Sequence, residues 1–161
     1  MTRLIRIMIL LALITGCAST PPLDLTNIDF AITPQTVLAT PDTIGHTVLW
    51  GGLILSSRNF KEYTQLEVLS YPVDQQGRIQ RKSEPMGRFY ARYPGYLETA
   101  EYRANRWITL TGSVRGVETG VVGNANYRFP VLDVRQLYLW SEQALQDNSP
   151  QLHFGIGVIF H

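Results

Sequence analysis

The sequence is poor in cysteine, in long hydrophobic runs and in charge of one sign. Cys17 is the single cysteine, which excludes an intramolecular disulfide. The apolar region between Arg6 and Pro21 has about a dozen residues, fewer than the roughly 20 that a transmembrane helix needs. Lysine and arginine number 14, against 13 for aspartate and glutamate, so the composition does not indicate the basic face of a nucleic-acid-binding protein.

The start of the chain has the order of a bacterial lipoprotein signal. Arg3 and Arg6 form a basic region, residues 7–14 are apolar, and small residues precede Cys17. Residues 14–17, Ile-Thr-Gly-Cys, match the lipobox, in which a diacylglycerol is attached to the thiol, the chain is cut before the cysteine and the new amino group is acylated. We therefore predict a lipoprotein signal peptide over residues 1–16 and lipid attachment at Cys17, in preference to a transmembrane helix or an ordinary secretion signal.

Lipidation at Cys17 predicts a permanent membrane anchor, because three acyl chains exceed the two signals that stable anchoring requires. The next residue is Ala18, whereas many Gram-negative lipoproteins kept in the inner membrane have Asp there, so we expect the export and sorting machinery to deliver this chain to the outer membrane. Removal of Arg3 and Arg6 leaves 12 basic residues (14 minus 2) against 13 acidic ones, a formal charge of −1. We expect no nucleic-acid partner, and the sequence carries no signal of oligomeric state.

Residues 17–45 are predicted to form the lipidated N-terminus and a tether, because their prolines favour an extended path. The alternating apolar residues of 28–32 favour a segment lying along the edge of the domain. Residues 46–161 are predicted to form a β-domain, since β-branched and aromatic residues alternate with polar ones and turn residues separate the runs. The expected strands cover residues 47–55, 62–72, 87–93, 107–115 and 131–140, and a last apolar segment covers 154–160.

The alternation is clearest at 107–115, where Ile108, Leu110, Gly112 and Val114 share one side. Gly116, Gly120 and Gly123 follow, and we interpret these glycines together with Gly112 as bends in the sheet, because charged residues stand among them. Residues 97–104 are predicted to form one short helix. Together these elements predict an all-β fold with one short helix, a small closed or partly open β-barrel similar to the oligonucleotide/oligosaccharide-binding (OB) type.

The chain resembles the Slp family of outer-membrane lipoproteins over nearly its whole length, lipobox included. The resembling segments, which fall in the family's order, are Val48–Gly52, Asn59, Thr64, Glu67–Pro72, Asp74–Arg78, Gly87–Phe89, Pro94–Leu97, Tyr102, Arg106, Thr109–Gly112 and Tyr127–Val131. Tyr90 and Thr99 are mild departures. The resemblance implies an outer-membrane lipoprotein, in some members linked to starvation or stress, with Cys17 as the lipidated cysteine and no catalytic residues.

The sequence contains no recognisable catalytic, metal or cofactor motif. His46, His153 and His161 lack the spacing of metal ligands and have no partner cysteine. Serine-nucleophile, phosphate-loop and dinucleotide patterns are missing, and the carboxylates are scattered, so that no pair suitable for glycoside hydrolysis is singled out. We therefore expect neither an enzyme nor a cofactor.

Arg88, Tyr90 and Arg92 are expected to share one face of a strand, with Phe89 and Ala91 on the other. Aromatic rings stack on sugars and arginine donates to oxygens, so this face is the candidate ligand site; the alternative is ordinary decoration of a barrel exterior. Trp50, Trp107 and Trp140 are expected in the core or at the barrel rim. The sequence favours a non-enzymatic envelope-maintenance or stress-related role, the alternative being a binding module for an envelope oligosaccharide or glycolipid.

Overall fold

A computed structural model describes residues 20–146 of the chain. Contacts divide the chain into two compact units, and Thr20–Ser141 forms the larger one. The described part of the other unit is a single short helix, α3 (Glu142–Gln146). Within residues 20–146, no helix has the length and apolar character needed to cross a membrane.

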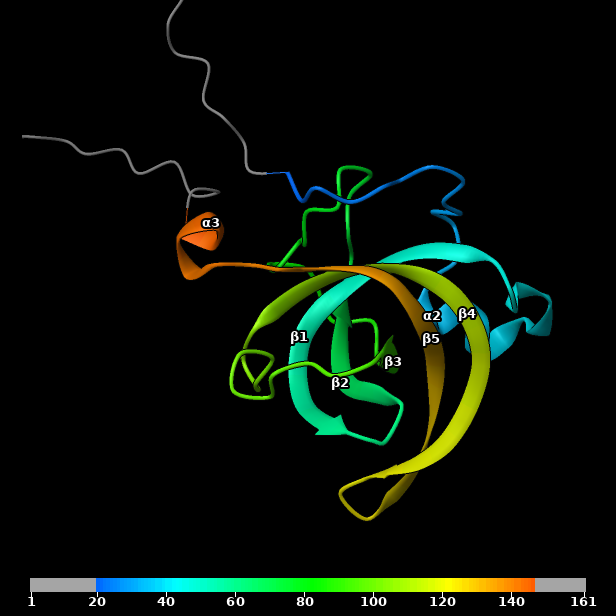
Figure 1. The fold of residues 1–161 in the computed structure, drawn as a ribbon. Helices are drawn as coiled ribbons and strands as arrows, with labels where there is room; N and C mark the ends of the chain where they lie inside the picture. The colour runs from blue at the N-terminus through cyan, green and yellow to red at the C-terminus, as the bar shows by residue number, and fades with distance from the viewer. Residues whose placement is uncertain (1–19, 147–161) are drawn as a thin grey trace, which may run out of the picture. The chain divides into compact units, whose positions relative to one another are not determined.

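The larger unit is a closed five-stranded barrel, which confirms the predicted all-β barrel (Figure 1). Its strands follow the order β1-β2-β3-β5-β4, and β4 pairs with β1 to complete the ring. Neighbouring strands are antiparallel except β3 and β5, which pair in parallel. The strands are β1 (Thr47–Asn59), β2 (Tyr63–Tyr71), β3 (Arg88–Pro94), β4 (Trp107–Val122) and β5 (Ala125–Leu139).

Alternation along the strands builds the core. In β2 the side chains of Thr64, Leu66, Val68 and Ser70 are buried, while their neighbours are partly exposed. Phe89 and Ala91 do the same in β3. Because a strand turns successive side chains to opposite faces, these residues fill the barrel interior. The core cluster also includes Val48, Trp50, Ile54, Ile108, Leu110, Val114, Leu132 and Val134.

Glycine permits close contact between β4 and β5. A Cβ at Gly112 would lie 2.2 Å from the carbonyl oxygen of Asp133, so any side chain there would collide with the backbone. The register of the pair shifts at Thr111/Gly112 and again between Val114 and Gly116, which places bulges at two of the predicted bend glycines. Beyond the second bulge the hairpin continues as paired strands to its turn at 123–124, so the segment between the predicted strands 107–115 and 131–140 is β-structure as well.

The segment predicted as a tether packs against the barrel from Pro21 onward. It contains α2 (Pro34–Ala39), which Thr33 caps, and the one-turn helix η1 (Pro41–Thr43). Ile32 and Val37 are buried in the core cluster, and the indole nitrogen of Trp50 donates to the Ile32 carbonyl over 2.8 Å. Residues 20–45 are therefore docked on the barrel and do not form a free tether, because their apolar side chains are buried against the end of the barrel.

The predicted helix over 97–104 is wrong. The amides of Glu101 and Tyr102 both donate to the Glu98 carbonyl, which makes a single turn that does not propagate. Leu97 is buried in the core and holds the start of this loop against the barrel. The described helices are α2, η1 and α3 instead, and the apolar segment 154–160 lies outside the described residues.

Candidate functional site

The structure brings Arg88, Tyr90 and Arg92 together on the outer face of β3. Strand β2 lies along one side, with Glu67 opposite Tyr90 and Gln65 opposite Arg92. On the other side β3 pairs with β5 over only three positions, from Tyr90–Val131 to Arg92–Asp133. The far half of the β4–β5 hairpin, residues 116–130, contributes side chains to the same face, and we call this part the hairpin arm.

Arg88 is held by two neighbours. Its Nη1 atom lies 2.7 Å from Oε1 of Glu67 on β2. Its backbone amide donates to the hydroxyl of Tyr127 in the hairpin arm over 2.9 Å. The cation is therefore already neutralised by a carboxylate, and the backbone beside it is tied to the arm.

Tyr90 is the packing surface for the hairpin arm. Its ring stacks on Phe129 with 4.0 Å between centroids and 11° between planes, and Phe129 is completely buried although it lies outside the barrel's core cluster. Burial, together with the nearby carboxylates of Glu67 and Glu118, raises the pKa of the Tyr90 hydroxyl above its usual value. Tyr90 is therefore a neutral, partly covered aromatic side chain.

Arg92 connects three elements. Its Nη2 atom lies 2.8 Å from Oε2 of Glu118 in the arm, and its Nε donates to Oε1 of Gln65 on β2 over 3.2 Å. The guanidinium carbon lies 4.9 Å from the centre of the Tyr63 ring. All three residues of the candidate face thus have intramolecular partners, and each of them touches the hairpin arm.

A groove of about 340 Å³ opens next to Arg92, where the parallel pairing of β3 and β5 stops. Its lining residues are Glu62, Tyr63, Arg92, Pro94, Arg115, Asp133 and Val134. Of the three predicted residues, only Arg92 lines it. Sequence reasoning missed Tyr63 and Arg115 as groove residues, because the groove depends on a strand pair that no local pattern specifies.

The groove does not have the character of an acid–base centre. Asp133 is ion-paired to Arg115 over 3.0 Å and both side chains are about half exposed, whereas a general acid needs a desolvated carboxyl. His46 lies elsewhere, 3.3 Å from Asp29, and both of these side chains are exposed. Residues 20–146 contain no cluster of three or more histidine, cysteine or acidic side chains able to hold a metal.

The tryptophans serve packing, as predicted. Trp50 and Trp140 are buried, and the Trp140 indole donates to the Thr109 hydroxyl over 3.0 Å. Trp107 is partly buried and meets the Tyr71 ring edge-on at 5.0 Å. None of the three lines the groove beside Arg92.

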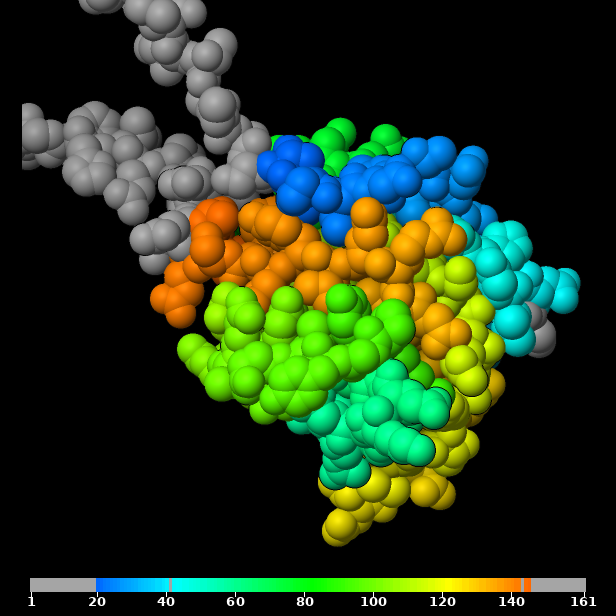
Figure 2. Space-filling view, viewed as in Figure 1, coloured from blue at the N-terminus to red at the C-terminus, as the bar shows by residue number. Residues whose placement is uncertain are grey.

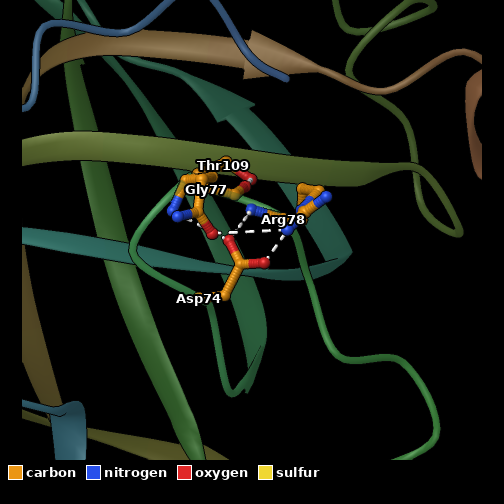
Figure 3. A network of polar contacts seen from close by, with 5 residues as sticks. Asp74, Gly77, Arg78 and Thr109 are labelled. Atoms are coloured by element: carbon orange, nitrogen blue, oxygen red, sulfur yellow. Dashed lines mark hydrogen bonds and ion pairs between the residues drawn. The ribbon is translucent and has the colours of Figure 1, made fainter. Parts of the chain in front are cut away.

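A polar network fixes the loop between β2 and β3 to the barrel (Figure 3). The Asp74 carboxylate accepts from the amide of Arg78 over 2.9 Å and from its Nε over 2.8 Å. The Gly77 carbonyl accepts from the Thr109 hydroxyl of β4 over 2.9 Å. Pro21 is buried against Gly77, so the N-terminal segment first contacts the barrel at this loop.

Residues 14–157 match the family model of the outer membrane lipoprotein Slp family. The chain belongs to this family. It is 28% identical over 139 residues to the uncharacterized lipoprotein YeaY of Escherichia coli, covering 85% of this chain and 67% of that protein. It is 30% identical over 139 residues to an uncharacterized protein of Haemophilus influenzae, covering 83% and 74%. To outer membrane protein Slp of Escherichia coli it is 26% identical over 118 residues, covering 73% and 62%.

Membership in the Slp family identifies the chain as a lipid-anchored lipoprotein of the outer membrane. Cys17, the predicted lipidation site, lies inside the matched region but outside the described residues. In the structure, the candidate face of Arg88, Tyr90 and Arg92 is the surface of the barrel on which the hairpin arm packs.

Proposed function

We propose that this protein is a non-enzymatic component of the envelope, anchored through lipid on Cys17, whose barrel lies directly at the membrane surface and serves envelope maintenance or stress resistance. The observation that carries the proposal is the burial of Pro21 against Gly77. Pro21 is the fourth residue after Cys17, and four residues span at most about 14 Å. An anchor at Cys17 therefore keeps the barrel within that distance of the lipid.

The side chains of the barrel support a role without catalysis. The arginines of the β3 face are engaged with Glu67 and Glu118, and the groove beside them holds an exposed ion pair. Catalytic groups need desolvation or a positioned base, and these residues are arranged as structural contacts.

The anchor is tested by Cys17→Ser, with the membrane fraction and the intact mass of the protein as readouts. We expect the wild-type protein to carry the mass of a diacylglycerol and one further acyl chain, and the variant to remain unprocessed. Ala18→Asp is the matched variant: it should leave lipidation intact and hold the protein in the inner membrane. An unmodified Cys17 in the native host contradicts the proposal.

The groove beside Arg92 favours a second function, binding of an envelope oligosaccharide or glycolipid. It is lined by the guanidinium groups of Arg92 and Arg115 and by the carboxylates of Glu62 and Asp133, which can exchange hydrogen bonds with sugar hydroxyls. A binding screen with envelope glycans tests this function. Loss of a bound glycan on Arg92→Ala, with Arg88→Ala as the control outside the groove, supports it; equal loss in both variants contradicts a site in the groove.

A further inference from the structure

The hairpin arm has one edge that no described strand covers. Strand β1 pairs with β4 only as far as Ser113, and the last backbone hydrogen bonds on that side of β4 are those of Val114. Beyond this point, residues 117–122 pair with residues 125–130 on their other side. Residues 20–146 provide no strand for the remaining side, so residues 117–122 form an open sheet edge, which we call the open edge.

Pro130 shows which backbone groups face the open edge. It lies opposite Val117 and has no N–H, so these two residues cannot form a pair that exchanges two backbone hydrogen bonds. Hydrogen-bonded and non-hydrogen-bonded pairs alternate along an antiparallel ladder, and the register does not shift between Val117 and the turn. Thr119 and Val121 therefore belong to non-hydrogen-bonded pairs as well. The N–H and C=O groups of all three β4 residues point away from β5, into the open edge.

The two edges of the arm differ in their protection. The β5 edge is covered by β3, because Phe129 stacks on Tyr90 of that strand. The open edge contains no lysine or proline, the residues with which proteins commonly prevent strand pairing, and its Val117 and Val121 side chains are exposed on one face. In the space-filling view the arm (yellow) projects at the lower end of the barrel (Figure 2). The described residues therefore leave the open edge accessible to another strand.

A pocket of about 210 Å³ adjoins the start of the open edge. Its walls come from α2, from the loop before β1 and from the arm, and they include Leu38, Ile44 and Val117. Of its described lining residues, Arg128 alone is charged. Val117 belongs to both the pocket and the open edge, so a strand paired with the edge brings one of its own side chains to the pocket. The mainly apolar walls favour an apolar side chain there.

A second copy of the chain does not fit the open edge of a membrane-anchored protein. Two copies that share the same edge are related by a two-fold axis perpendicular to their strands, so the two chains point in opposite directions. Figure 1 shows the N-terminal segment (blue) at one end of the barrel and the turn of the arm (yellow) at the other. Because the proposed lipid anchor holds the N-terminal end at the membrane, two copies in one leaflet cannot take inverted orientations. The strand that covers the open edge therefore comes from a different chain.

We propose that the open edge binds an extended segment of a partner protein as an additional antiparallel strand, with apolar residues of the partner at alternate positions and one of them in the pocket beside Val117. Backbone hydrogen bonds to Val117, Thr119 and Val121 supply affinity, and the pocket supplies specificity. Opposite the intervening Glu118 the partner carries a basic or neutral residue, because like charges directly opposite each other destabilise a sheet. The exclusion of a second copy rests on the proposed anchor, whereas the open edge itself does not.

The probe is a fluorescein-labelled peptide, Val-Thr-Val-Lys-Leu with an amidated C-terminus, titrated against the full-length lipidated protein in detergent micelles. Antiparallel pairing places its two valines opposite Val121 and Thr119 and its leucine opposite Val117. The lysine then faces Glu118. N-methylation of the central valine removes the N–H that meets Thr119 and should weaken binding at least about fivefold. N-methylation of the lysine alters an N–H that points away from the open edge and should leave the affinity unchanged.

Matched substitutions test the same contact from the side of the protein. Thr119→Pro removes an N–H of the open edge without removing a backbone bond to β5, and should abolish binding of the peptide. Thr119→Val keeps the backbone donor and should bind the peptide as the wild type does. Amide exchange in residues 125–130 reports whether the arm stays paired in both variants. If the arm opens in Thr119→Pro, the comparison of the two N-methylated peptides decides alone.

Three results overturn the inference: a peptide that does not bind, equal effects of N-methylation at the two positions, or binding that survives in Thr119→Pro. A homodimer in micelles that Thr119→Pro dissociates also overturns it, because a second copy is then the occupant. Failure of the anchor is seen separately, in the intact mass of the protein. An unlipidated protein that still binds the peptide rejects the anchor alone.

Discussion

The β4–β5 hairpin has two halves that differ in their surroundings. The near half, residues 107–114 with 132–139, is part of the barrel wall, whereas the hairpin arm extends beyond the barrel. The near half pairs with β1 as well, and Ile108, Leu110 and Val114 are fully buried. In the arm, the described pairing partners of residues 117–122 are the facing residues 125–130, and Val121 is 65% exposed. One pair of strands thus passes from a core environment to a surface one at the bulge beside Gly116.

The difference lies in what fixes each half. Backbone proximity and aliphatic packing fix the near half, where Gly112 meets the Asp133 backbone. The arm is fixed by side chains, through the stacking of Phe129 on Tyr90 and the ion pair of Glu118 with Arg92. We therefore expect backbone clashes in the near half to destabilise the whole barrel, and losses in the arm to be smaller and local.

The largest effect is expected from Gly112→Val. A Cβ at this position would lie 2.2 Å from a backbone oxygen, which cannot move without breaking the β4–β5 pairing. Overpacking of a core costs about 1–3 kcal/mol and occasionally more, so we expect a loss of about 3 kcal/mol in the free energy of unfolding. Chemical denaturation measures it.

The matched variant in the arm is Gly120→Val. Its Cβ would meet the Phe129 ring at 2.9 Å and the Tyr90 hydroxyl at 3.0 Å, and both are side-chain atoms that can shift. Its cost should be clearly smaller than that of Gly112→Val, because side chains can shift where backbone cannot. Equal losses at the two glycines would show that the arm is as rigidly held as the barrel wall.

The next largest effect is expected from Tyr90→Ala. It uncovers the buried Phe129 ring and removes the stacked pair, so we expect a loss of about 2 kcal/mol, from lost apolar burial and aromatic contact together. Tyr90→Phe keeps the ring and should be nearly neutral. Thermal unfolding compares the two, and a comparable loss in Tyr90→Phe would indicate that the hydroxyl, rather than the stacking, holds the arm.

The sequence predicted the faces of the strands well because alternation is a local property. Phe89 and Ala91 point inward and Arg88, Tyr90 and Arg92 outward, as the pattern of β3 requires. The barrel class followed from several such strands with glycine bends between them.

The partners of the outward residues were not predictable, because they come from distant positions. Glu118 is 26 residues from Arg92 and reaches it only through the bent hairpin. For residues 20–45, docking was expected only at 28–32, which includes the buried Ile32. For the rest the prolines suggested extension, because contacts with the end of a barrel formed by other strands leave no local pattern. The false helix at 97–104 followed helix propensity, which the anchoring of Leu97 overrides.

Acid pH should lower the stability of the barrel through the Asp74 network in the β2–β3 loop, and this loss should not depend on the hairpin arm. Burial works to raise the pKa of this carboxyl, but hydrogen bonds from Arg78 and Gln76 outweigh it, so the pKa lies below the usual value. A lowered folded-state pKa adds stability above the unfolded pKa of about 3.9, and this stability is lost as the pH falls through the folded-state pKa. Asp74→Asn should therefore lose stability at pH 7 and show less further loss at pH 3 than the wild type.

The comparison for Asp74→Asn is Glu84→Gln, an exposed carboxylate in the same loop. Melting temperatures at the two pH values are the measurement. If Glu84→Gln flattens the acid response as much as Asp74→Asn does, the acid sensitivity belongs to general charge and not to the Asp74 network.

The smallest effect is expected from Glu118→Gln. Glu118 is partly exposed, so its pair with Arg92 is worth roughly 0.2–1 kcal/mol, and Arg92 keeps Gln65 and the Tyr63 ring as partners when the pair is lost. The global melting temperature should barely move, while amide hydrogen exchange in residues 117–122 should speed up. High salt should bring the exchange rates of the wild type toward those of the variant, because screening weakens exposed pairs.

The control for Glu118→Gln is Glu67→Gln. It breaks the pair with Arg88, which joins β2 to β3 within the barrel wall, and should leave exchange in the arm unchanged. Faster exchange in the arm in both variants would mean that the stability of the arm depends on the charge of the whole β3 face. That result would contradict the conclusion that the near half and the arm of the hairpin are fixed by separate contacts.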